Sequence, residues 1–100
     1  MFIAIVDFTV AAENRAAALA TLLAEATVIR SMPGNLAFRP YLDPVKADAL
    51  CILHEWKDAE SFKAYTGSET FRASGAALRP MMSSAPVSRR MTATLLETVA

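Results

Sequence analysis

Hydrophobic and polar residues alternate along four stretches of the chain, and this two-residue period is typical of β-strands. The predicted strands are Phe2–Val10, Asn35–Leu42, Ala49–Trp56 and Val87–Val99. In the first and third of them both faces carry apolar side chains, so neither face suits water alone. The second and third strands lie close together along the chain, which favours a hairpin between them.

The segments between the strands show helical patterns. The alanine-rich run from Arg15 to Arg30 has high helix propensity. Asn14 is a suitable N-cap for this helix, and Pro33 and Gly34 end it. The first and second strands are therefore joined by a helix.

A second helical region follows the third strand. Asp58 is a good N-cap for a short helix that carries Phe62 and Tyr65, and Gly67 ends it. Ser68 caps the next stretch, in which apolar or small residues recur at helical spacing. These residues are Phe71, Gly75, Leu78 and Met82.

The predicted order is strand, helix, strand, strand, helix, strand, in a single domain over residues 1–100. This is the ferredoxin-like βαββαβ arrangement of the α+β class, a four-stranded antiparallel sheet with its helices on one face. The helices leave the other face uncovered, and that face is partly apolar. A second copy of the chain is the simplest cover for it, so we expect a homodimer.

Composition narrows the function classes. Hydrophobic residues make up 54% of the chain, above the usual 45 to 50%. A monomer of this size would expose part of them, which favours a self-association surface or an apolar pocket. Ten basic side chains balance ten acidic ones, so we expect neither nucleic-acid binding nor a polybasic attachment to a membrane.

The single cysteine and the opening residues bear on location. Cys51 has no partner for an intramolecular disulfide and is predicted to be a buried strand thiol. The apolar segment Met1–Val6 lacks a positively charged flank and is too short for a signal peptide or a membrane span. We therefore expect a cytoplasmic protein. No phosphate-binding loop, dinucleotide fingerprint, zinc-ligand spacing or nucleophile elbow is found.

Four short strings resemble the antibiotic biosynthesis monooxygenase family, and the resemblance spans nearly the whole chain. The strings are Met32–Leu36, Leu53–Asp58, Ser61–Tyr65 and Ser68–Phe71. The resemblance implies a dimeric α+β barrel with a cavity between sheet and helices. In such relatives, phenols or quinols react there with molecular oxygen without metal, flavin or haem.

The resemblance also assigns residues. Trp56 stands where such relatives keep a tryptophan, and Tyr65 stands where many have a histidine. Haem-degrading relatives use that histidine with a strand asparagine, near whose position Asp7 lies here, and Thr70 replaces a second frequent histidine. Only the tryptophan is retained, so haem is not expected as a cofactor.

The candidate catalytic residues are His54 and Tyr65. His54 is the only histidine, and its imidazole is suited to hydrogen-bond or deprotonate a phenol near pH 7. It shares a strand face with Trp56, which is expected to hold an aromatic substrate. The expected substrate-binding side chains are Trp56, Phe62, Phe71 and Met82. Packing in the core is the competing interpretation for His54, Trp56 and Tyr65.

Two carboxylates have structural interpretations beside functional ones. Glu55 lies on the face opposite Trp56 and is expected to pair with Arg39 or Arg90. Asp7 is suited either to orient a substrate hydroxyl or to remain solvated. The resemblance to this family, together with the His54 and Trp56 pattern, implies a cofactor-independent monooxygenase for a hydrophobic phenol, quinol or polyketide-like aromatic. A non-catalytic ligand-binding dimer and a non-oxidative isomerase with His54 as base are the alternatives.

Overall fold

The computed structural model describes all 100 residues and has the predicted fold. Its four strands form one antiparallel sheet in the order β2-β3-β1-β4, as the ferredoxin-like arrangement requires. The second helical region is divided at Gly67 into two helices. The elements are β1 (Phe2–Thr9), η1 (Ala12–Asn14), α1 (Arg15–Arg30), β2 (Asn35–Leu42), β3 (Ala49–Trp56), α2 (Ala59–Thr66), α3 (Glu69–Leu78), η2 (Arg79–Met81) and β4 (Val87–Thr92).

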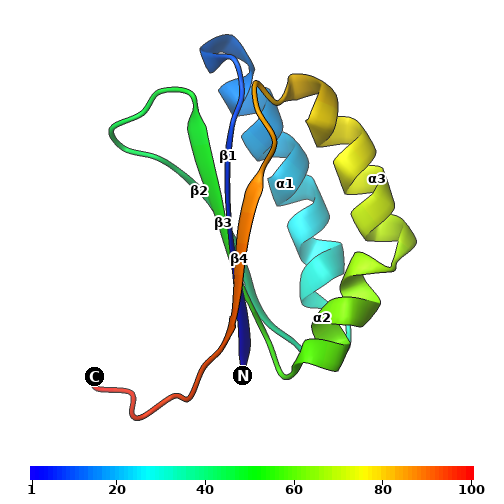
Figure 1. The fold of residues 1–100 in the computed structure, drawn as a ribbon, viewed down its shortest axis with the longest axis vertical. Helices are drawn as coiled ribbons and strands as arrows, with labels where there is room; N and C mark the ends of the chain where they lie inside the picture. The colour runs from blue at the N-terminus through cyan, green and yellow to red at the C-terminus, as the bar shows by residue number, and fades with distance from the viewer.

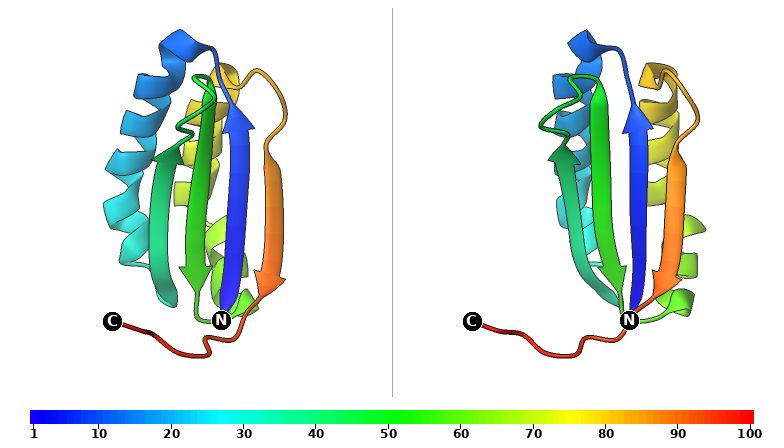
Figure 2. Two further views of the ribbon diagram at one scale, coloured as in Figure 1. Left: turned by 90° about the vertical axis from the view of Figure 1, so that its left-hand side faces the viewer. Right: turned by 60° about the vertical axis from the view of Figure 1, so that its left-hand side comes forward.

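All three α-helices lie against the same face of the sheet, and the other face is bare (Figure 1). Both turned views in Figure 2 show that bare face with β1 between β3 and β4. Within this register Ala4 lies opposite His54 on one side and Arg90 on the other. None of the helices combines the length and apolar character that a membrane crossing needs.

The helix-facing side of the sheet carries the core. Along β3 every second residue is buried, from Leu50 to Trp56. The buried apolar residues of α1 oppose them at helical spacing, which is the geometry of a helix packed on a sheet. They are Ala18, Leu22, Ala26 and Ile29.

Two of the three expected helix caps form. The side chain of Asp58 accepts a hydrogen bond from the Ser61 backbone N–H, and that of Ser68 accepts one from Phe71. Asn14 precedes α1 but makes no side-chain cap. Its backbone is helical because η1 runs directly into α1, so its side chain is not positioned to cap.

Gly34 shapes the turn between α1 and β2. Its φ of +83° lies in the left-handed region, which favours glycine. A Cβ atom at this position would overlap with the side chain of Ser61. The Lys57 backbone N–H donates to the Gly34 carbonyl at 2.7 Å, so the turn holds the end of β3 beside the start of β2.

The last strand is shorter than predicted. It ends at Thr92 instead of Val99, and residues 93–100 have no regular structure. The reason is the register, because Thr92 pairs with Phe2 and the last backbone contact joins Ala93 to Met1. The pairing of β4 with β1 ends at this point.

Candidate functional site

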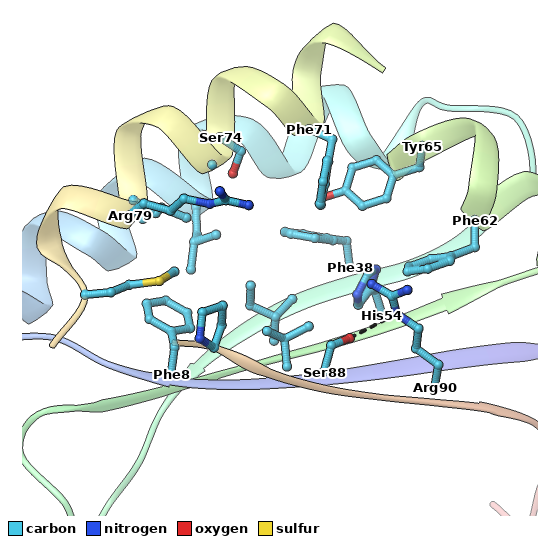
Figure 3. Close-up of a pocket in the computed structure, with 17 residues that line it drawn as sticks. Phe8, Phe38, His54, Phe62, Tyr65, Phe71, Ser74, Arg79, Ser88 and Arg90 are labelled. Atoms are coloured by element: carbon cyan, nitrogen blue, oxygen red, sulfur yellow. Dashed lines mark hydrogen bonds between the residues drawn. The ribbon is translucent and has the colours of Figure 1, made fainter. Parts of the chain in front are cut away.

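A cavity of about 280 Å³ lies between the helix-facing side of the sheet and helices α2 and α3 (Figure 3). Its walls are mainly apolar and include Phe8, Phe38 and Ile52. This is the character of a small-molecule site. Five of the six predicted site residues line it: His54, Phe62, Tyr65, Phe71 and Met82.

His54 is held rigidly by its strand and by its neighbours. It is an inward residue of β3 and is only 3% exposed. Its ring lies edge-on to those of Phe38 and Tyr65, with centroid distances of 5.5 and 5.9 Å. The indole N–H of Trp56 donates a hydrogen bond to His54 Nδ1 at 2.9 Å. Because Nδ1 accepts, we assign the hydrogen of the neutral ring to Nε2.

The surroundings of His54 keep it uncharged. Burial, and secondarily the positive charge of Arg90, lowers its pKa to about 4. At neutral pH the ring therefore carries no charge, and its only basic lone pair is engaged by Trp56. This geometry suits His54 to donate a hydrogen bond from Nε2 and does not suit it to accept a proton.

Trp56 lies behind the cavity wall. It is fully buried and is not among the residues that line the cavity. Its ring stacks on that of Tyr65 at 5.0 Å with 23° between the planes. The expected direct stacking on a substrate therefore differs from the observed arrangement, in which Trp56 orients His54 and supports Tyr65.

Tyr65 lines the cavity and remains a phenol at neutral pH. Burial, with the negative charge of Glu25 as a smaller cause, raises its pKa to about 12. Its ring contacts that of Phe71 edge-on at 5.3 Å. Tyr65 thus offers the cavity a neutral hydroxyl beside an aromatic wall.

Arg90 is a site residue that the sequence analysis did not place in the cavity. Its guanidinium group lies 4.9 Å from the centroid of the Phe62 ring and donates to Ser88 Oγ at 3.2 Å. Figure 3 shows it beside His54 at one end of the cavity. The side chain faces inward because Arg90 pairs with Ala4, an inward residue of β1.

This position corrects the expected ion pair of Glu55. Glu55 belongs to the bare face of the sheet, whereas Arg90 lines the cavity on the other face. Arg39 forms no ion pair with Glu55 either, since the salt bridges present are Arg72–Glu69 and Arg89–Asp7. Asp7 is half exposed on the bare face, away from the cavity.

Cys51 is less buried than predicted, because it lies on the bare face between β1 and β2. Burial and the carboxylate of Asp7 raise the pKa of its thiol, so it is not activated as a nucleophile. The side chains form no group of three or more His, Cys, Asp or Glu residues that could hold a metal ion.

The sequence of this chain matches a known protein family. The family model for antibiotic biosynthesis monooxygenases matches residues 1–77 of the chain. The chain belongs to this family. Family membership supports a general monooxygenase-like role, which agrees with an apolar cavity beside polar donors. A search of curated proteins found no match.

Solved structures that carry the same family name share the fold. One from Caulobacter crescentus has a TM-score of 0.88 at 22% identity, over 94% of this chain and 90% of that one. One from Deinococcus radiodurans has a TM-score of 0.90 at 16% identity, over 100% and 99%. One from Chloroflexus aurantiacus has a TM-score of 0.80 at 23% identity, over the whole of both chains. At these identities the likeness concerns the fold alone.

Proposed function

We propose that this family member binds a small phenol or quinol in the cavity and oxidises it with molecular oxygen without a resident cofactor. The observation that supports this most strongly is the pair formed by His54 and Arg90. A neutral N–H donor and a guanidinium cation face the same apolar space. No carboxylate lines the cavity to compete for them.

The proposed role of this pair is to stabilise a phenolate. Arg90 supplies a positive charge, and His54 Nε2–H donates to the phenolate oxygen. The His54 donor is buried, and the exposed Arg90 cation lies beside it, so one fixed N–H group and one positive charge meet the same oxygen atom. Because no base lines the cavity, the phenolic proton passes to solvent.

The phenolate then supplies the electrons for the reaction with oxygen. It transfers one electron to O2, and the resulting superoxide and phenoxyl radical combine at a ring carbon that carries a hydrogen. The peroxide anion takes up a proton from solvent, and loss of water, which includes the ring hydrogen, leaves a carbonyl group. With 1-naphthol, the products are 1,4-naphthoquinone and water, so one oxygen atom enters the ring and the other becomes water.

Oxygen uptake tests this proposal. We expect purified protein to consume oxygen with 1-naphthol, and Arg90→Gln to lower kcat/KM about tenfold by removing one charge-assisted contact to the anion. Arg72→Gln is the matched control, because Arg72 is exposed on α3 and pairs with Glu69. No uptake above buffer across a panel of naphthols and quinols would exclude the oxygenase, and equal rates for both variants would exclude the role of Arg90.

The isomerase alternative loses support from the geometry of His54. It requires a free lone pair on the imidazole, and Nδ1 already accepts from Trp56. The same assay tests the ligand-binding alternative. Binding of naphthols without oxygen consumption would show that the protein is a ligand-binding protein and not an oxygenase.

We also propose that the bare sheet face forms a homodimer, as expected from its apolar pattern. Partly exposed apolar side chains gather there, namely Ile3, Ile5, Leu53 and Met91. Light scattering at micromolar concentration should therefore give twice the chain mass of 10.8 kDa. Leu53→Asp should shift the particle toward a single chain by placing a charge in the contact. A wild-type particle of 10.8 kDa would contradict the dimer.

The cytoplasm remains the proposed compartment. Cys51 is a free thiol, and free thiols persist in reducing compartments.

A further inference from the structure

The cavity has a second polar end that the proposed chemistry does not use. Arg79 follows α3 directly, and its guanidinium group points into the cavity (Figure 3). The side chain is exposed and forms neither a salt bridge nor a side-chain hydrogen bond. The side chain is thus a cation without a partner in the protein.

Ser74 adds a second unused donor at this end. It is only 7% exposed and lines the cavity beside Arg79 (Figure 3). Its hydroxyl group forms no hydrogen bond with the rest of the protein and opens onto the cavity. A polar group of a ligand is the natural partner for it.

The two polar ends are well separated. Met82, three residues after Arg79, forms a bridge with Val10, whereas Arg90 pairs with Ala4. Val10 follows the end of β1 and Ala4 lies near its start. The two guanidinium groups enter the cavity from different elements, one from the residue after α3 and the other from β4 (Figure 3). Figure 3 shows aromatic side chains between them. An aromatic ligand lying along the cavity would therefore meet a guanidinium group at each end.

The chemistry of the second end fits a carboxylate. A guanidinium group presents parallel N–H donors that match the two oxygens of a carboxylate, and the Ser74 hydroxyl group adds a third donor. No aspartate or glutamate lines the cavity, so no side chain of the protein occupies this role.

We propose that the ligand of this cavity is an aromatic acid. Its phenolic oxygen lies at the Arg90–His54 end, and its carboxylate binds Arg79 and Ser74. The assignment of the phenolic end rests on the proposed function. The cavity volume of about 280 Å³ lies just below the usual range for ligand pockets, about 300–1,000 Å³. The acid is therefore small, with a single ring or two fused rings.

A matched pair of ligands tests the proposal in the absence of oxygen, where no turnover occurs. The probes are 6-hydroxy-2-naphthoic acid and its methyl ester, which differ in the charge of the group that meets Arg79. Calorimetry with the full chain should show the acid binding about tenfold more tightly than the ester, as expected for one charge-assisted contact at a partly open site.

Three variants identify the residue responsible. Arg79→Gln should remove the preference by weakening binding of the acid and leaving the ester unchanged, and Arg79→Lys should retain part of it. Arg72→Gln removes the same charge from α3 outside this cavity and should behave as wild type. Because Arg79 is exposed, the variants should unfold at the wild-type urea concentration.

Equal affinity of the wild-type protein for acid and ester would overturn the proposal, and so would a preference that survives in Arg79→Gln. The oxygenase is judged separately by oxygen uptake. A preference that depends on Arg79 without any uptake would retain the acid site and exclude the oxygenase. Uptake without the preference would retain the oxygenase and exclude the acid site.

Discussion

Replacing Trp56 with alanine is expected to lower the free energy of unfolding by about 4 kcal/mol, near the upper range for large-to-small changes in a core. Trp56 is fully buried and stacks on Tyr65, so the change leaves a cavity under the site. It also leaves His54 Nδ1 without its donor. Urea unfolding at pH 7 measures the effect.

Trp56→Phe separates packing from the hydrogen bond. Phenylalanine retains much of the aromatic volume but cannot donate to His54, so we expect a loss of about 1–2 kcal/mol for the unpaired acceptor. If Trp56→Ala cost less than Trp56→Phe, the burial of the indole would not be a main source of stability.

The stability of the protein is expected to fall by about 3 kcal/mol between pH 7 and pH 4 because of His54 alone. The pKa of His54 is lowered from 6.5 to about 4 in the folded chain. Between these values the unfolded chain binds a proton that the folded chain does not, so acid favours unfolding. The contribution is complete above pH 6.5 and is lost as the pH falls toward 4.

His54→Gln isolates this effect. Glutamine does not titrate, and its amide oxygen is able to accept from the Trp56 indole. The difference in unfolding free energy between wild type and this variant should therefore shrink as the pH falls, while the carboxylates contribute equally to both proteins. A difference independent of pH would show that His54 is not held neutral. Nitrogen NMR at pH 7 should also find the hydrogen on Nε2.

Most of the fold was predictable from local patterns. The alternation in Ala49–Trp56 identified both the strand and its inward face, because a period of two assigns every side chain to one side of a sheet. Asp58 and Ser68 marked two helix starts because a short polar side chain before a helix caps its free N–H groups. The end of β4 was missed, because pairing with β1 decides it and the apolar residues after Thr92 gave no local signal for it.

The cavity was predictable in outline, but its polar groups were not. His54, Phe62 and Tyr65 lie on inward faces that periodicity identifies. Arg90 lies on an edge strand that is exposed along its whole length, so alternation alone does not reveal which side faces the helices. The register with Ala4 resolves this, and no local pattern contains that register.

The composition of the chain also gave no information about the charge of the cavity. The chain has no net charge, yet the cavity is lined by Arg79 and Arg90 without any carboxylate. The number of charged residues does not reveal this, because segments far apart in the sequence bring the two arginines to one cavity.

Local residue order was sufficient for most of the strand and helix bounds, because period, caps and turn residues act over a few neighbours along the chain. The resemblance of four short strings was sufficient for the family. The roles of individual side chains depended on contacts between segments far apart in sequence. His54 became a donor through its contact with Trp56 and the nearby charge of Arg90. Burial and charge are properties of the folded molecule, and they decide which proton each site residue holds.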